Sequence, residues 1–130
     1  MEKILVVDDE RPIRELVDLF LARVGYKAIK ASSGREAIEV AAKENPRLII
    51  LDMRMPGLHG LDTCRELRSR QETRGIPILV LTGYTENERE ALDAGADDLM
   101  TKPFRPEELI ARAKALLKVS CREDEVERER

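Results

Sequence analysis

Residues 4–10 read ILVVDDE, four strand-forming residues in a row followed by three acids. Because every position of the run is apolar, both faces of the strand are apolar, as in a parallel strand that helices cover on both sides. Residues 48–52 read LIILD and repeat the pattern, again with an acid directly after the apolar run. The two stretches predict an α/β domain with a parallel sheet, and they put carboxylates at the ends of two strands.

The segments around these two strands alternate between helical and extended patterns. Helical spacing follows the first strand from Ile13 to Val24, with Pro12 in the first turn and Gly25 at the end. The other expected elements are a strand at 27–31, a helix from the Ser33/Glu36 capping box to Pro46, a helix at 61–69, a strand at 76–81, a helix from the Thr85/Glu88 capping box to Gly95, a strand at Leu99 and Met100, and a helix after Pro103 and Pro106. Five strand–helix units predict a doubly wound five-stranded parallel sheet, (βα)5, with strand order 2-1-3-4-5.

Length and composition restrict the function further. The 130 residues are the size of one domain, and 23 basic against 26 acidic residues give a net charge of −3, so direct nucleic-acid binding by this chain is not expected. The longest apolar runs have four residues, far fewer than the roughly 20 that cross a membrane. There is no signal-peptide pattern, and Cys64 and Cys121 are predicted to be free thiols, so we expect a cytoplasmic protein with no membrane contact.

The C-terminal residues differ in character from the rest. Nine of the 13 residues from 118 to 130 are charged. We therefore expect residues 1–118 to form the domain. Residues 119–130 are predicted to be a charged tail or linker, or a frayed extension of the last helix, outside the core.

The carboxyl ends of the strands carry the candidate site, because ligands of doubly wound sheets bind there, near the reversal of strand order. Asp8 and Asp9 follow the first strand, Asp52 ends the third, Thr82 ends the fourth, and Lys102 follows the fifth. Two carboxylates about 4 Å apart repel by roughly 4 kcal/mol at an effective dielectric constant of about 20. A cluster of three is therefore expected to keep a proton or to recruit a cation, and hard oxygen ligands suit Mg²⁺.

These side chains together suit phosphoryl transfer. A carboxylate can attack a phosphoryl group and form an acyl phosphate. Mg²⁺ and the Lys102 ammonium would neutralise the phosphoryl oxygens, and the Thr82 hydroxyl would donate a hydrogen bond to one of them. Each residue also has a simpler interpretation: Asp8 and Asp9 as helix caps, Asp52 as a turn residue, Lys102 as a surface lysine and Thr82 as a strand former.

Five motifs resemble the receiver domain of two-component response regulators over residues 3 to about 118. They are VVDDE at 6–10, LDMRMP at 51–56 with Gly60 after it, LT at 81–82, GADD at 95–98 and KPF at 102–104. The resemblance implies the flavodoxin-like fold of that CheY-like family. It also implies that Asp52 is the phosphoacceptor, which receives phosphate from a sensor histidine kinase or a phosphotransfer protein.

The same resemblance implies which residues bind the metal. Mg²⁺ would contact Asp9, Asp52 and the backbone carbonyl of Arg54, and Asp8 would act through water.

Further residues are implied to bind the phosphoryl group and to switch. Thr82 and Lys102 would contact the phosphoryl oxygens, and the peptide bond between Lys102 and Pro103 would be cis. The surface of the fourth helix, fifth strand and fifth helix, roughly residues 84–118, would change on phosphorylation.

The sequence departs from the family pattern at Leu99, where an aromatic residue usually takes part in the switch. Arg54 and Tyr84 lie two residues beyond Asp52 and Thr82. They are candidates for tuning the lifetime of the acyl phosphate, because their bulky side chains would shield it from water.

Two other functions compete with a switch. A phosphatase with an aspartate nucleophile would need a second Asp two residues later as general acid, but Arg54 stands there, so an enzyme is not expected. A phosphate-independent interaction module would not need Asp52, Thr82 and Lys102, although Leu99 is compatible with it. No second folded domain is expected within these residues. The output domain or effector, the cognate kinase and the signal stay unknown, and a homodimer is left open.

Overall fold

The computed structural model describes residues 2–53, 60–83 and 88–129, and from residue 119 on it describes the backbone alone. These residues form a parallel sheet in the order β2-β1-β3-β4-β5. The strands are β1 (Lys3–Val7), β2 (Lys27–Ala31), β3 (Leu48–Asp52), β4 (Ile78–Thr82) and β5 (Asp98–Thr101). The helices are α1 (Arg11–Arg23), α2 (Gly34–Glu44), α3 (Gly60–Ser69), α4 (Glu88–Asp93) and α5 (Pro106–Glu129). The predicted doubly wound α/β fold and its strand order are confirmed.

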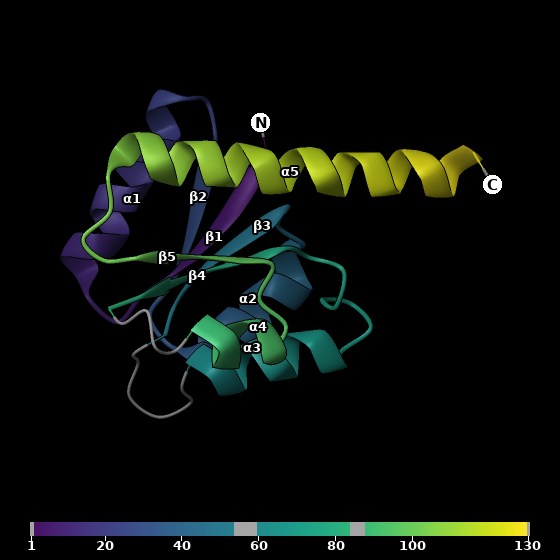
Figure 1. Ribbon diagram of the computed structural model, residues 1–130, viewed down its shortest axis with the longest axis horizontal. Helices are drawn as coiled ribbons and strands as arrows, with labels where there is room; N and C mark the ends of the chain where they lie inside the picture. Colours follow the sequence, from purple (N-terminus) through teal and green to yellow (C-terminus); the bar gives the residue numbers. More distant parts are fainter. Residues whose placement is uncertain (1, 54–59, 84–87, 130) are drawn as a thin grey trace.

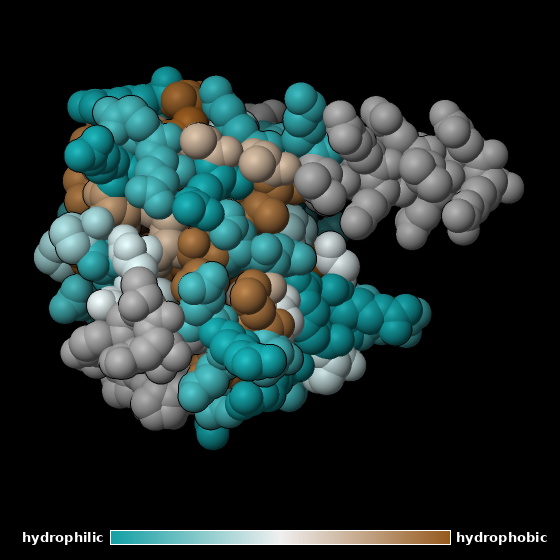
Figure 2. Space-filling model, in the orientation of Figure 1, coloured by the Kyte–Doolittle hydropathy of each residue, from teal (hydrophilic) through white to brown (hydrophobic). Residues whose placement is uncertain are grey.

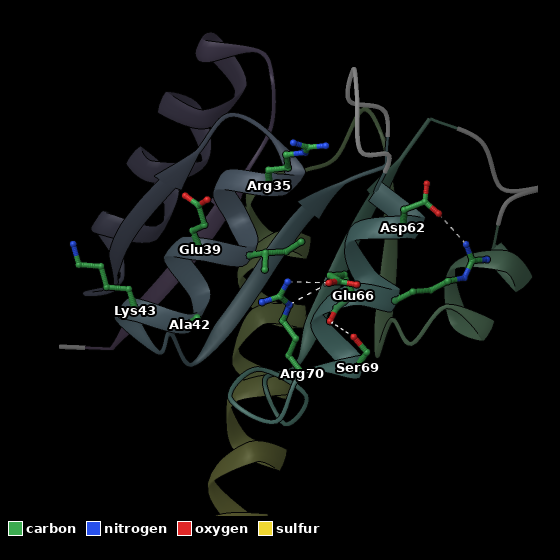
Figure 3. A pocket seen from close by; sticks show the side chains of 10 residues that line it. Arg35, Glu39, Ala42, Lys43, Asp62, Glu66, Ser69 and Arg70 are labelled. Atoms are coloured by element: carbon green, nitrogen blue, oxygen red, sulfur yellow. Dashed lines mark hydrogen bonds and ion pairs between the residues drawn. The ribbon is translucent and has the colours of Figure 1, made fainter.

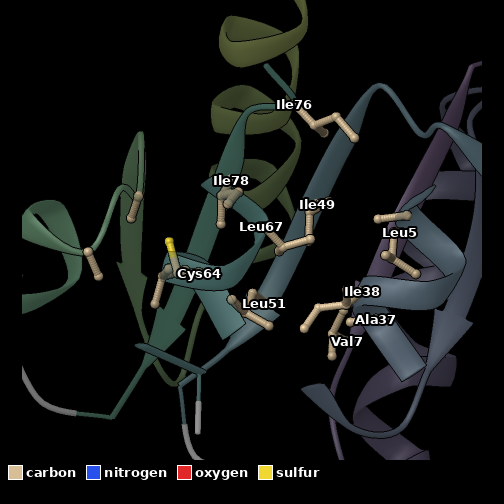
Figure 4. Close-up of a cluster of buried hydrophobic side chains, with 14 of the residues drawn as sticks. Leu5, Val7, Ala37, Ile38, Ile49, Leu51, Cys64, Leu67, Ile76 and Ile78 are labelled. Carbon is tan, nitrogen blue, oxygen red and sulfur yellow. The ribbon is translucent and has the colours of Figure 1, made fainter. Parts of the chain in front are cut away.

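Two hydrophobic clusters lie on opposite faces of the sheet. Under α1 and α5, Val17, Leu21 and Leu109 are fully buried with Ile4 and Ile50. Figure 1 shows α5 on one side of the sheet and α3 with α4 on the other. The second cluster lies under α2, α3 and α4 and includes Leu5, Val7, Ala37, Ile38, Ile49, Leu51, Cys64, Leu67, Ile76 and Ile78 (Figure 4). Every residue of β3 and β4 is buried, as continuous apolar runs predict for central parallel strands.

The ends of the first two helices follow their sequence signals with one difference. Gly25, just past α1, has φ +88°, a left-handed conformation that favours glycine. Ser33 Oγ accepts from the N–H of Glu36 at 3.2 Å, as a capping box requires. The Glu36 carboxylate, however, accepts from the N–H and hydroxyl of Ser32, one residue before the expected partner. Two donors on Ser32 compete successfully with the single N–H of Ser33.

Helix α4 ends before its predicted bound. The expected cap of α4, Thr85, lies outside the described residues, and the helix is described from Glu88 to Asp93. The N–H groups of Ala94 and Gly95 bond to the last turn of α4, and Gly95 has φ +111°. The helical pattern that was expected to reach Gly95 thus ends two residues earlier, in a turn that the left-handed glycine closes.

The backbone of α5 continues through the charged C-terminal residues. The helix begins at Pro106 and extends to Glu129, and its C-terminal half projects beyond the sheet (Figure 1). Of the two alternatives for residues 119–130, this is the helical extension. The division into a domain and a tail or linker stays a prediction.

The surface in Figure 2 is mostly hydrophilic, with scattered apolar patches. Among the described residues, the large apolar side chains that are exposed are Leu16, Leu19, Val24 and Leu92. None of the helices within the described ranges is both long enough and apolar enough to span a lipid bilayer.

Candidate functional site

The acidic residues predicted from the strand ends meet at one edge of the sheet. In the pairing of β1 with β3, Val7 lies opposite Leu51, so the next residues, Asp8 and Asp52, are neighbours. One carboxylate oxygen from each of Asp8, Asp9 and Asp52 lies within 4.8 Å of the other two. Asp8 is 1% exposed and Asp52 4% exposed, whereas Asp9 faces solvent. The expected convergence of three carboxylates is therefore present, and two of them are buried.

Lys102 brings a positive charge to this cluster. Its Nζ donates to Asp52 Oδ1 at 3.0 Å and to Asp8 Oδ2 at 3.4 Å. Its backbone N–H donates to the carbonyl of Thr82 at 2.8 Å, which ties the segment after β5 to the end of β4. The predicted cis peptide bond between Lys102 and Pro103 is present. The ammonium thus reaches the buried carboxylates from the end of β5, which lies two positions from β3 and three positions from β1 in the sheet.

Burial shapes the protonation of the cluster. It raises the pKa of Asp8 from 3.8 to about 6, against the hydrogen bond from the Glu10 N–H, and the charge of Asp52 adds to the rise. Burial also opposes the charge of Lys102, but hydrogen bonds and charge pairing with Asp52 and Asp8 prevail and raise the pKa of Lys102. Three carboxylates with one ammonium leave excess negative charge in a desolvated place. A further cation held by these oxygens would relieve it, so the residues fit a hard divalent ion.

The turn after β1 holds Asp8 at three points. Its N–H donates to the carbonyl of Ala31 at 3.2 Å, and its Oδ1 accepts from the N–H of Glu10 at 2.9 Å. Its carbonyl accepts from Nη1 of Arg14 at 2.7 Å. The alternative in which Asp8 and Asp9 merely cap α1 does not match this turn, because the N-cap residue is Glu10.

The two predicted switch positions lie on β4 and β5. Thr82 ends β4, one residue beyond Leu81, which pairs with Asp52, and it is 2% exposed. Leu99 lies opposite Val80 and is half-buried against the cluster under α2, α3 and α4. Thr82 is therefore at the same edge of the sheet as Asp52. The parts that Thr82 and Leu99 play in switching stay predictions.

The start of α3 packs tightly behind Asp52. A Cβ atom on Gly60 would lie 2.6 Å from Cα of Met53 and 2.7 Å from the carbonyl oxygen of Asp52, and both are backbone atoms. The Gly60 N–H also donates to the carbonyl of Met53 at 3.1 Å. A residue without a side chain is therefore required beside the backbone that carries Asp52. Arg54 and Tyr84, the predicted carbonyl ligand and lifetime positions, lie outside the described residues.

A Gly60→Ala substitution is expected to lower the free energy of unfolding by about 2 kcal/mol, because the added methyl group forces backbone atoms apart. The matched control is Gly75→Ala, since a Cβ there meets no atom within 4 Å. That control is expected to be neutral or slightly stabilising, because alanine restricts the unfolded chain. Denaturant unfolding of both variants measures the difference. Equal stabilities would show that the space beside Asp52 accepts a side chain.

A separate groove lies between α2 and α3 (Figure 3). Side chains of both signs line it, among them Arg35, Glu39 and Lys43 from α2. Across from them, Glu66 of α3 and Arg70, the residue after the end of α3, form an ion pair at 2.9 Å. The groove contains none of the predicted site residues, and its mixed charges favour no ligand of one sign.

Arg14 is the residue at the site that the sequence did not single out. An arginine on the first turns of an amphipathic helix is usually a solvated surface residue. No spacing of residue types in the sequence marks this position. Only the folded turn shows that its guanidinium reaches the carbonyl of Asp8.

A doubly wound sheet in this order, with three carboxylates and a lysine where the order reverses, defines a receiver-type signalling domain. Residues 4–114 match the response regulator receiver domain family, and the chain belongs to that family.

Individual relatives agree with this assignment. The phosphate regulon transcriptional regulatory protein PhoB of Pseudomonas aeruginosa is 44% identical over 117 residues, which are 88% of this chain and 51% of PhoB. The alkaline phosphatase synthesis transcriptional regulatory protein PhoP of Bacillus subtilis is 48% identical over 121 residues, 92% of this chain and 50% of PhoP. The chain thus spans about half the length of the curated relatives it matches.

Solved structures show the same similarity. The chemotaxis response regulator CheY4 of Vibrio cholerae has a TM-score of 0.84 and 36% identity, and the match covers 89% of this chain and 98% of CheY4. NtrX from Brucella abortus has a TM-score of 0.89 and 32% identity, over 98% of this chain and 29% of NtrX.

Proposed function

We propose that this chain is a phosphorylation-controlled switch in which Asp52 accepts a phosphoryl group from a sensor histidine kinase or a phosphotransfer protein, with Mg²⁺ as cofactor. The observation that carries the proposal is the contact of Lys102 Nζ with Asp52 Oδ1 at 3.0 Å, beside Asp8 and Asp9. The proposed nucleophile, its counter-ion and the proposed oxygen ligands of the cation are therefore side chains that lie close together. Membership of the receiver family supports the same role.

In the proposed reaction, a carboxylate oxygen of Asp52 attacks the phosphorus atom of a phosphohistidine. A bond forms between that oxygen and phosphorus, and the bond from phosphorus to the donor's imidazole nitrogen breaks, leaving its electron pair on the nitrogen. The product is an acyl phosphate on Asp52. The Lys102 ammonium would pair with the phosphoryl oxygens as negative charge builds on them, and the Thr82 hydroxyl would donate a hydrogen bond to one of them.

The three carboxylates would hold the cation. We propose Asp9 and Asp52 as direct ligands together with the backbone carbonyl of Arg54, and Asp8 as a ligand through water. Asp9 is exposed and open to a metal, whereas Asp8 is buried and already accepts from the Glu10 N–H. When bound, Mg²⁺ would supply charge neutralisation for the phosphoryl oxygens.

The proposed response is a shift between two conformations at the surface of α4, β5 and α5. Moving the equilibrium from about 1:99 to about 99:1 needs a preference of roughly 5.5 kcal/mol for the active state. Hydrogen bonds to a charged phosphoryl group contribute about 1.5–3 kcal/mol each, so those from Lys102 and Thr82 together with the cation are sufficient in size. Because Leu99 has no ring, we propose that Thr82 and the segment after it carry the change to α4 and α5.

Two alternatives give different chemistry. We propose that the chain does not turn over external phosphate esters, since Arg54 stands where an aspartate phosphatase needs its general acid. A phosphate-independent interaction module is the second candidate, and Leu99 at the switch position is the observation that favours it.

Labelling with a small acyl phosphate donor separates the three functions. With Mg²⁺ present, the chain is expected to take up as much as one phosphoryl group, and hydroxylamine, which cleaves acyl phosphates, is expected to remove it. Chelating the metal is expected to suppress the uptake. Continuous hydrolysis of an external ester would instead support an enzyme. A folded chain that takes up no label would support the interaction module.

The expected partners follow from the switch. PhoB and PhoP are transcriptional regulatory proteins about twice as long as the matched region. We therefore propose that this chain acts on an output domain or a separate effector. Three further expectations stay predictions: Arg54 and Tyr84 tune the lifetime of the acyl phosphate, this chain does not bind nucleic acid directly, and the protein is cytoplasmic. A homodimer is a further possible partner arrangement.

A further inference from the structure

We propose that Arg14 is a positioning residue for the metal site, because its guanidinium fixes the carbonyl of Asp8 and so sets the direction from which Asp9 reaches the cation. The inference rests on the proposed function, since it takes Asp9 as a Mg²⁺ ligand.

The contact that carries the inference is short and partly buried. Nη1 of Arg14 donates to the carbonyl oxygen of Asp8 at 2.7 Å. That carbonyl belongs to the planar peptide unit whose nitrogen is the N–H of Asp9. Because the unit is planar, holding its oxygen also restrains the orientation of its nitrogen. A guanidinium from α1 thus orients the backbone of the residue that follows Asp8.

Asp9 depends on this bond more than Asp8 does. The Asp8 side chain is held by the Glu10 N–H at 2.9 Å and by Lys102 at 3.4 Å, and its N–H is tied to Ala31 at 3.2 Å. Asp9 is exposed, so surrounding side chains do not enclose its carboxylate. The position of that carboxylate is therefore determined largely by the peptide on which Arg14 acts.

The charge of Arg14 and its hydrogen bond are expected to have opposite effects on the Mg²⁺ affinity of the site. A cationic side chain near three carboxylates repels a divalent ion and weakens its binding. Holding Asp9 in place strengthens the binding, because a side chain that is already ordered loses less conformational entropy when the ion binds. The two effects predict opposite changes in Mg²⁺ affinity when Arg14 is removed, so a binding measurement decides between them.

The test is Mg²⁺ binding by titration calorimetry on the full chain, with no phosphodonor present. Arg14→Ala is expected to raise the Kd about fivefold, as the loss of one ordinary hydrogen bond does. Arg14→Lys keeps a donor and the charge and is expected to restore most of the affinity. The matched control is Arg11→Ala, which removes an equal charge from the same first turn, where Arg11 pairs with Glu15 at 2.9 Å. This control is expected to leave the Kd unchanged or slightly lower.

A second readout follows the turn after β1. The N–H of Glu10 donates to Asp8 Oδ1 at 2.9 Å. Its amide hydrogen exchange is expected to quicken in Arg14→Ala and to stay near the original rate in Arg14→Lys and Arg11→Ala. If Arg14→Ala binds Mg²⁺ as tightly as the unchanged chain, or more tightly, the inference is overturned while the proposed function stands. If the unchanged chain binds no Mg²⁺, the proposed function fails and the inference with it.

Discussion

An Asp52→Asn variant is expected to take up no label from a small acyl phosphate donor under conditions in which the unchanged chain takes up as much as one phosphoryl group. An amide nitrogen or oxygen is a far weaker nucleophile than a carboxylate, and the variant also loses one of the three negative charges of the acidic cluster. The side chain keeps its shape, so Asn fits the same buried position. Phosphoprotein mass measured on the intact chain gives the result directly.

The control for this variant is Asp62→Asn, the same chemical change at an exposed aspartate of α3. Asp62 pairs with Arg65 at 3.3 Å and takes no part in the acidic cluster. It is expected to label like the unchanged chain. Full labelling of Asp52→Asn would mean that another residue is the phosphoacceptor and would remove the chemical basis of the proposed switch.

An Asp8→Asn variant is expected to be more stable than the unchanged chain by about 2 kcal/mol near neutral pH without divalent ions. Burial raises the pKa of Asp8 in the folded chain from 3.8 to about 6, so the folded state disfavours the ionised carboxylate. Asn cannot ionise, yet its side-chain oxygen can still accept from the Glu10 N–H. The ion pair with Lys102 is lost, which makes the gain smaller than the full effect of ionisation.

The raised pKa of Asp8 also predicts that the free energy of unfolding falls as the pH rises. Below pH 3.8 the Asp8 carboxyl is protonated in both states, and its contribution to stability is largest. As pH rises towards about 6, the unfolded chain releases the proton and the folded chain keeps it, so the free energy of unfolding falls. At about 1.4 kcal/mol for each pKa unit, the loss is about 3 kcal/mol, and it is complete above the pKa in the folded state.

Denaturant unfolding at several pH values, with the metal chelated, measures this effect. The unchanged chain is expected to lose stability from about pH 4 to about pH 7 relative to Asp8→Asn, whereas Asp62→Asn is expected to follow the unchanged chain. Adding Mg²⁺ is expected to reverse the order, because a cation that binds the ionised site stabilises the folded state. Parallel pH profiles for Asp8→Asn and the unchanged chain would contradict the burial of an ionisable Asp8.

The strands and the arrangement of the sheet were predictable because their signals are local. Continuous apolar runs such as 48–51 leave few alternatives to a central parallel strand, and strand–helix alternation with right-handed crossovers leaves few topologies. The end of α4 was less predictable, because a glycine can either continue a helix or adopt the left-handed conformation that ends it. Gly95 adopts the left-handed conformation, with φ +111°. The partner of Glu36 also differed, since the N–H and the hydroxyl of Ser32 both donate to its carboxylate and prevail over the N–H of Ser33.

The residues at the carboxyl ends of the strands were predictable from local patterns: Asp8, Asp9, Asp52, Thr82 and Lys102. The end of a strand is marked by the point where its apolar run stops, which is a property of adjacent residues. How these residues meet depends on the folded chain. The contacts of Lys102 with Asp52 and Asp8 join segments 50 and 94 residues apart, and the raised pKa of Asp8 comes from burial by neighbouring elements. The bond from Arg14 to the carbonyl of Asp8 likewise depends on how α1 leaves β1, which no spacing of residue types encodes.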